Sequence, residues 1–214
     1  MSDDSPDNIL IYVHDPMCSW CYGFRPTWSE VKSQLPEGLP VVSLLGGLAS
    51  DTDIPMPEEM VEHLKGTWSR IAEICGVRFN HDYWDQEPAP PRTTYISCRA
   101  VISAERLAGR GDAFCERIQD AYYQEALNVW QPEVLCDLAE EFGFRRDAFE
   151  EILNSDEVKT VHIEQQQLAA RLQVEGYPSL ILIHKEDGFP ISVRHGDAAT
   201  MIRDINDLLA KVQA

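Results

Sequence analysis

Two cysteines at positions 18 and 21 are the residues of this chain best suited to chemistry. They follow the apolar run Ile9–Val13 and precede a pattern typical of a helix. Cysteines at this spacing on a helix lie on one face, close enough for a disulfide, so the pair can cycle between dithiol and disulfide without much backbone motion. The free N–H groups of the helix start favour a thiolate on the first sulfur, and the thiolate is the form that attacks a disulfide. We therefore predict Cys18 as the nucleophile and Cys21 as the resolving thiol.

Zinc binding is the main alternative use of such a pair. Zinc normally takes four ligands, and the chain has no second Cys-x-x-Cys and no His-x-x-x-His to complete a site. We therefore predict redox chemistry, no metal and no cofactor beyond the redox-active disulfide. The other cysteines fall on helix-like segments near apolar stripes, where free cysteine commonly behaves as a small buried hydrophobe, and a regulatory disulfide between two of them stays open. These are Cys75, Cys98, Cys115 and Cys136.

Composition narrows the classes of partner and compartment. The 214 residues contain 18 Lys and Arg and 36 Asp and Glu, and the formal net charge of 18 − 36 = −18 argues against nucleic acid and anionic membranes as partners. Six cysteines with one close pair fit a reducing compartment. The segment Met1–Asn8 lacks the basic start and apolar stretch of a secretory signal, and no apolar run is long enough to span a bilayer. We predict a soluble, cytoplasmic protein.

The first fifty residues read as a strand, a helix and a second strand. Apolar runs at Ile9–His14 and Pro40–Gly47 are typical of strands, and Tyr22–Gln34 between them can form a crossover helix. Pro26 lies inside that helix and should bend its axis. The segment therefore predicts a βαβ unit that places the cysteine pair at the start of its helix.

Helical patterns dominate the middle of the chain, and strands return after it. Apolar spacing predicts a final hairpin with strands at Ser179–Ile183 and Pro190–Val193, a turn at Asp187–Gly188, and a last helix capped by Asp197. The predicted helices before the hairpin are Glu58–Cys75, Thr93–Ala108, Asp112–Leu127, Pro132–Phe142, Asp147–Leu153 and Val158–Leu172. The order is βαβ, helical block, ββα.

This order resembles the thioredoxin fold of the DsbA-like family, and most closely its cytoplasmic DsbA/FrnE-like branch. The segments that carry the resemblance are Asp15–Gly23, Pro26 and Glu175–Ser179. The resemblance implies an α/β thioredoxin fold formed by residues 1–55 and 155–214, with an all-helical domain inserted at 56–154. It also implies that Pro178 is cis and faces the disulfide, and that the backbone at Tyr177 pairs with an extended substrate.

Two departures from the family pattern bear on the chemistry. Thioredoxins keep a buried acidic residue six positions before the nucleophile, and Tyr12 stands there in this chain. The more oxidising relatives also have a histidine between the cysteines, where this chain has Ser19 and Trp20, so we expect a less oxidising couple. His14 could supply a nearby positive charge that modulates the pKa at the pair, although a lone histidine at a strand end is more often structural. Trp20 is predicted to be an exposed apolar contact for substrate.

The leading functional hypothesis is a thiol–disulfide oxidoreductase of the protein-disulfide isomerase or reductase type, acting on protein or small-molecule disulfides and thiols. Two alternatives stay open. Kappa-class glutathione transferases and hydroxychromene carboxylate isomerases are similar in fold but bind glutathione and typically carry serine at the position of Cys18. A non-catalytic, redox-sensing interaction protein is the other alternative. Glutathione is a candidate reductant for the oxidoreductase and a candidate ligand for the transferase or isomerase.

Overall fold

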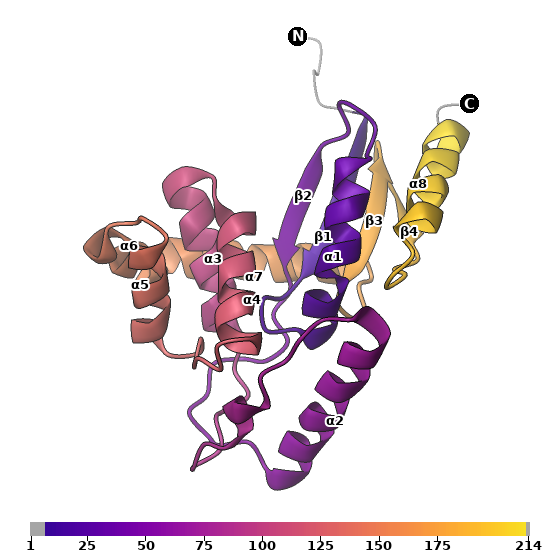
Figure 1. Cartoon of the computed structure of the whole chain (residues 1–214). Helices are drawn as coiled ribbons and strands as arrows, with labels where there is room; N and C mark the ends of the chain where they lie inside the picture. The colour runs from indigo at the N-terminus through magenta and orange to yellow at the C-terminus, as the bar shows by residue number, and fades with distance from the viewer. Residues whose placement is uncertain (1–6, 213–214) are drawn as a thin grey trace.

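A four-stranded mixed sheet forms the centre of one half of the molecule (Figure 1). The computed structural model describes residues 7–212, so the prediction made on the N-terminal leader falls mostly outside the described residues. The strand order is β2-β1-β3-β4, in which β1 pairs parallel with β2 and antiparallel with β3. The strands are β1 (Asn8–His14), β2 (Val41–Leu45), β3 (Ser179–His184) and β4 (Asp187–Ile191).

Helices cover both faces of this sheet. On one face, α1 (Ser19–Ser33) and α8 (Ala198–Val212) bury an apolar layer that includes Leu10, Phe24 and Met201. On the other face, Ala169 and neighbouring side chains of α7 (Asp156–Arg171) pack on strand residues that alternate with the first set. The predicted thioredoxin-type βαβ…ββα architecture is confirmed.

The remaining helices form a second body beside β2, and its core is rich in aromatic rings. Trp68, Phe79 and Tyr123 stack or meet edge to face with centroid separations of 5.0–5.3 Å, a geometry that aromatic pairs favour. Its elements are α2 (Glu58–Cys75), a short 3₁₀ helix (His81–Trp84), α3 (Tyr95–Ala108), α4 (Gly111–Tyr123), α5 (Pro132–Glu141) and α6 (Arg146–Asn154).

The helix α7 contacts both bodies. It packs against β2 of the sheet and against α3 and α6 of the helical block, and Figure 1 shows it crossing behind both. The proposed limits of the inserted domain, 56–154, are not tested by these contacts and stay a prediction.

The final hairpin differs from its prediction. The turn lies at Lys185–Glu186, with Lys185 in the left-handed region at φ 55°, while Asp187 pairs with His184 inside the hairpin. The turn predicted at Asp187–Gly188 is therefore wrong, because a two-residue loop closes the hairpin earlier and β4 takes up those residues. Pro190 is tolerated in β4 because that strand is at the edge of the sheet.

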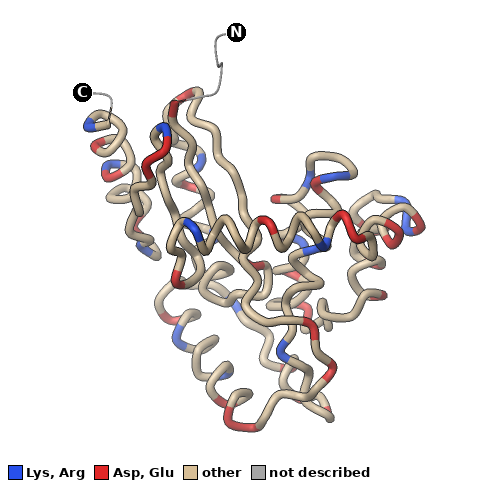
Figure 2. The backbone as a smooth tube through the Cα atoms, turned by 180° about the vertical axis from the view of Figure 1, so that it is seen from behind, with Lys and Arg blue, Asp and Glu red and all other residues tan. Residues whose placement is uncertain are grey.

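Asp and Glu lie on helices and loops in both bodies, with fewer Lys and Arg scattered among them (Figure 2). Among residues 7–212, no helix is both long and apolar enough to cross a membrane.

Candidate active site

Cys18 occupies the position immediately before α1, at the C-terminal end of the loop that follows β1. Its backbone is extended (φ −84°, ψ 114°), and its Sγ accepts a hydrogen bond from the backbone N–H of Cys21 at 3.4 Å. This is the arrangement of a helix N-cap with sulfur in the place of the usual oxygen. The sulfur therefore lies where the unpaired N–H groups and the helix dipole favour negative charge.

Cys21 lies one turn inside α1 and is almost completely buried, with 1% of its surface exposed. Burial raises the pKa of the Cys21 thiol well above its usual range, and the neighbouring Cys18 raises it further. Cys21 is therefore a protonated thiol at neutral pH, and a protonated thiol is a poor nucleophile. A raised pKa suits the second step of an exchange reaction, in which Cys21 acts only after Cys18 has reacted.

A cis peptide bond between Tyr177 and Pro178 faces the pair, as the resemblance implied. The thiol of Cys18 lies 3.6 Å from the carbonyl oxygen of Tyr177. The structure thus brings together Cys18, Cys21 and the Tyr177–Pro178 bond from segments about 160 residues apart in the sequence. A substrate that reached this sulfur would find a main-chain acceptor beside it.

A buried carboxylate holds the loop that carries Cys18. Asp15 accepts hydrogen bonds from the backbone N–H of Met17 at 2.7 Å, from the backbone N–H of Leu48 at 2.8 Å and from the hydroxyl of Thr94 at 2.6 Å. Burial raises the pKa of Asp15, and these bonds lower it in part. Asp15 thereby joins the loop before α1, the loop after β2 and the start of α3. Asp15 belongs to the motif Asp15–Gly23, but nothing in its local sequence predicts this role.

Two glycines after β2 leave space for aromatic rings. A Cβ on Gly46 would lie 2.0 Å from Cζ and 2.2 Å from the hydroxyl oxygen of Tyr177, and one on Gly47, which has φ +78°, would lie 2.7 Å from the ring of Tyr95. The Tyr177 side chain therefore rests on the Gly46 backbone rather than projecting freely. Partial burial raises the pKa of Tyr177 to about 12, so its hydroxyl stays protonated. The adjacent glycines were the available sequence signal for this contact.

Trp20 is half-buried beside the pair. Its ring meets the ring of His195 edge to face at a centroid distance of 5.0 Å, and its backbone carbonyl accepts a hydrogen bond from Nε2 of His195 at 3.2 Å. His195 thus carries its proton on Nε2, because a carbonyl can only accept. The suggested contact of Trp20 with substrate stays a prediction. His195 had no signal in the sequence, since it follows β4 and meets Trp20 only through the fold.

His14 is buried at the end of β1. Its ring stacks on Tyr12 at 4.5 Å, and its Nδ1 lies 3.8 Å from Sγ of Cys115. Burial lowers the pKa of His14 to about 4. The imidazole is consequently neutral at physiological pH, and a positive charge from His14 is not expected there. Tyr12 is likewise buried, so the position at which thioredoxins keep a carboxylate holds an uncharged ring.

The remaining cysteines lie on α2, α3, α4 and α5 of the helical block. Cys98, Cys115 and Cys136 are buried as predicted, and Cys75 at the end of α2 is half-buried. Burial raises the pKa of each of these thiols, which opposes thiolate chemistry. Among the described residues, no group of three or more His, Cys, Asp and Glu side chains could hold a metal ion.

A cysteine pair at the start of the first helix, beside a cis-proline at one end of a four-stranded sheet, is typical of the thioredoxin-fold thiol–disulfide oxidoreductases. The chain belongs to the DSBA-like thioredoxin domain family, whose sequence model matches residues 9–195.

Solved structures show the same fold over nearly the whole chain. A Nitrosomonas europaea protein described as a candidate protein disulfide isomerase is 26% identical, with a TM-score of 0.84 over 97% of this chain and 99% of its own. The cytosolic disulfide reductase DsbM from Pseudomonas aeruginosa is 25% identical, with a TM-score of 0.78 over 94% of this chain and 98% of its own. DsbM has also been solved with GSH.

A curated relative has a different described role. The ClpXP adapter protein SpxH of Bacillus subtilis is 24% identical over 193 residues, which cover 87% of this chain. The match spans only 62% of the relative's own length.

Proposed function

We propose that this chain is a disulfide reductase of the cytoplasm in which Cys18 and Cys21 form the redox couple. The placement of Cys18 Sγ carries the proposal: it accepts the Cys21 N–H at 3.4 Å and lies 3.6 Å from the Tyr177 carbonyl. The Cys21 N–H favours negative charge on this sulfur. The Tyr177 carbonyl is a main-chain acceptor with which an extended substrate can pair. The similarity to a cytosolic disulfide reductase supports the direction and the compartment.

The reaction has two steps. The thiolate of Cys18 attacks one sulfur of the substrate disulfide, which forms a mixed disulfide and releases the other substrate sulfur as a thiolate. Cys21 then loses its proton and attacks Sγ of Cys18, which releases the second substrate sulfur and leaves a Cys18–Cys21 disulfide. Two electrons pass from the protein dithiol to the substrate. Isomerisation of a protein disulfide would use the same mixed disulfide without the second step.

Glutathione is the proposed reductant that restores the dithiol. One glutathione thiolate attacks the protein disulfide, and a second attacks the resulting mixed disulfide. The two glutathiones thereby give two electrons to the protein and leave as glutathione disulfide. The structure of DsbM with GSH, 26% identical to this chain, supports the proposal. We propose that the Tyr177 backbone pairs with the peptide part of glutathione and of protein substrates alike, with Trp20 as an apolar contact.

The test uses single cysteine variants and glutathione disulfide. Cys21→Ser should stop after the first step and carry one glutathione, detected by mass spectrometry, whereas Cys18→Ser should carry none. Cys75→Ser alters a half-buried cysteine at the end of α2, and once reduced it should convert glutathione disulfide to glutathione in a single turnover at the wild-type rate. Wild-type reductase activity in Cys18→Ser would overturn the proposal.

A second candidate function is that of an adapter for another protein, and the similarity to SpxH favours it. An adapter would bind its partner equally well in Cys18→Ser and Cys21→Ser and would show no turnover of disulfides. Activity that survived loss of Cys21 and required glutathione would instead favour the transferase or isomerase alternative. Retention of both cysteines favours the reductase.

A further inference from the structure

The strand β2 leaves one edge of the sheet open. It lies at the end of the strand order, next to β1 only. The backbone N–H of Leu10 donates to the carbonyl of Pro40 at 2.9 Å, and the N–H of Gly46 donates to the carbonyl of His14 at 2.8 Å. Backbone groups alternate along a parallel strand, so the even-numbered residues face β1. Val41, Ser43 and Leu45 therefore point their N–H and C=O groups away from the sheet.

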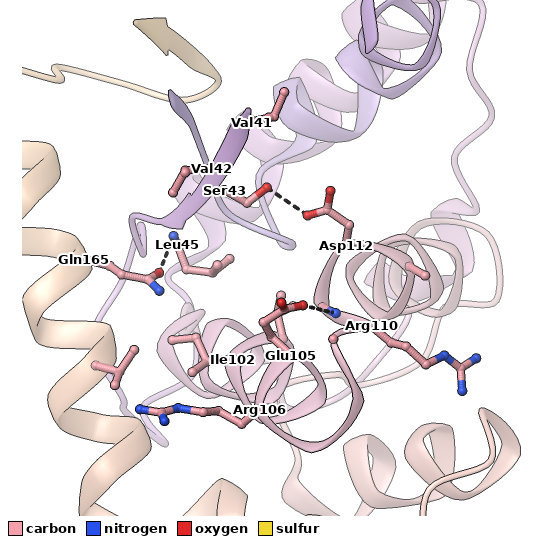
Figure 3. A pocket seen from close by; sticks show the side chains of 15 residues that line it. Val41, Val42, Ser43, Leu45, Ile102, Glu105, Arg106, Arg110, Asp112 and Gln165 are labelled. Atoms are coloured by element: carbon pink, nitrogen blue, oxygen red, sulfur yellow. Dashed lines mark hydrogen bonds between the residues drawn. The ribbon is translucent and has the colours of Figure 1, made fainter. Parts of the chain in front are cut away.

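One of these outward groups already has a partner. The N–H of Leu45 donates to Oε1 of Gln165 on α7 at 2.7 Å (Figure 3). Within the described residues, the backbone N–H and C=O groups of Val41 and Ser43 make no such bond. One residue lies between Val41 and Ser43, and an added strand forms hydrogen bonds with every second residue of its neighbour.

A groove of about 660 Å³ runs along this edge. Figure 3 shows β2 on one side, with α3 and the turn into α4 opposite and α7 alongside. Its apolar lining includes Val42, which is 40% exposed, Val101 of α3 and Val161 of α7. Apolar walls beside open main-chain groups match a polypeptide in extended form, which offers both apolar side chains and a pairing edge.

The carboxylates of the groove are already bonded within the protein. Glu105 accepts from the backbone N–H of Gly111 at 2.9 Å, and Asp112 accepts from the hydroxyl of Ser43 at 2.8 Å. A ligand in the groove would therefore meet the free main-chain groups of Val41 and Ser43 rather than unpaired carboxylates.

We propose that this groove binds an extended segment of a client polypeptide as an added strand on β2, paired with Val41 and Ser43. The inference rests on the proposed function only in taking the segment from a disulfide-bearing client. β2 leads directly into Gly46, which contacts Tyr177 at the cis-proline. A client held along β2 is thereby anchored close to Cys18 without occupying the Tyr177 backbone.

The test compares two substitutions of one residue. Ser43→Pro removes the outward N–H at a position where an edge strand tolerates proline, whereas Ser43→Ala removes only the hydroxyl bond to Asp112. The probe is fluorophore-labelled insulin B chain with its cysteines carbamidomethylated, so that binding needs no thiol exchange. We expect Ser43→Ala to bind it within about twofold of wild type and Ser43→Pro about tenfold more weakly, the effect of about one backbone hydrogen bond.

Single-turnover reduction of glutathione disulfide by the reduced protein serves as the control, because that substrate is too small to need the groove. Ser43→Pro should keep its wild-type rate. Amide hydrogen exchange on the wild-type protein gives a second measurement that does not depend on how the variant folds: the B chain should slow exchange at Val41 and Ser43.

Three results would overturn the inference: no binding by wild type, equal binding by the two variants, or no added protection at Val41 and Ser43. If the B chain slowed amide exchange at Val41 and Ser43 but the protein reduced no disulfides, the groove would be supported and the proposed reductase function rejected.

Discussion

At the scale of single residues, the two buried cysteines are distinguished by their positions on α1 and by hydrogen bonding. Cys18 caps α1 and faces the Tyr177 carbonyl, while Cys21 is a buried thiol with a raised pKa. The sequence spacing alone predicted the order of attack, because only the first cysteine of such a pair lies at the helix start. It could not show which groups surround each sulfur, since Tyr177 reaches Cys18 through the fold.

The buried imidazole of His14 should make stability depend on pH. Its folded-state pKa of about 4 is below the ordinary 6.5, so its contribution is fully present above pH 6.5 and is lost as the pH falls towards 4. The shift corresponds to on the order of 3 kcal/mol. We expect His14→Phe, which keeps a ring against Tyr12, to reduce the loss of unfolding free energy between pH 6.5 and 4, measured by urea titration.

His162 provides a second, independent test of the same effect. Burial also lowers its pKa to about 4, and it lies at Tyr95 in the other body, so His162→Phe should remove a separate part of the same pH dependence. If both single variants kept the full wild-type pH dependence, the neutral burial of these histidines would be contradicted.

At the scale of elements, Asp15 connects three segments that position Cys18. Asp15→Ala would leave the buried N–H of Met17 without its partner and remove the link from Thr94, so we expect a loss of about 2–4 kcal/mol in unfolding free energy. The rate of disulfide reduction should fall as well. Thr94→Val removes one bond to the carboxylate and the hydroxyl that accepts from the N–H groups of Leu48 and Ala49, but it keeps the bonds from Met17 and Leu48 to Asp15, so it should cost less. Equal stability of Asp15→Ala and wild type in urea would contradict this role.

The contact of Gly46 with Tyr177 couples the loop after β2 to the cis-proline. Gly46→Ala would place a Cβ 2.0 Å from the Tyr177 ring, so the ring must move and the carbonyl near Cys18 should move with it. We expect the second-order rate constant for the reaction of the reduced protein with glutathione disulfide to fall about tenfold, a cost of about 1.4 kcal/mol in transition-state stabilisation. Adding Tyr177→Ala should restore part of the loss.

The control for that prediction is Gly66→Ala. A Cβ on Gly66 of α2 meets no atom within 4 Å, and alanine favours helix, so activity should not change. An unchanged rate constant in Gly46→Ala would contradict the prediction, because the ring would then have adjusted without disturbing the site.

The elements themselves were largely predictable, and the links between them were not. Apolar periodicity and the stop at Gly76 placed α2 correctly at Glu58–Cys75, and Asp197 does cap α8 by accepting from Thr200 N–H. The hairpin turn was misplaced because Asp-Gly is a common turn sequence, whereas here Lys185 adopts the left-handed conformation. The partners of Asp15 lie 33 and 79 residues away, at distances that no local pattern reports.

At the scale of the whole molecule, two bodies meet beside β2, and the redox pair and the open strand edge lie at different places on that boundary. Arg25 of α1 pairs with Asp120 of α4 at 2.8 Å, and Lys32 pairs with Asp112 at 3.7 Å, so ion pairs link the bodies. These pairs are partly exposed and add little stability by themselves. The apolar packing of α7 on both bodies is the stronger link.

The reduction potential of the Cys18–Cys21 couple tests the central proposal most directly. It is measured by equilibrating the protein in glutathione buffers and following thiol loss, with Cys21→Ser as the control. Because His14 is neutral and no histidine lies between the cysteines, we predict one two-electron transition nearer to the −270 mV of thioredoxin than to the −120 mV of DsbA, and no such transition in Cys21→Ser. Absence of a transition in the wild-type protein, or a potential close to that of DsbA, would contradict a reductase.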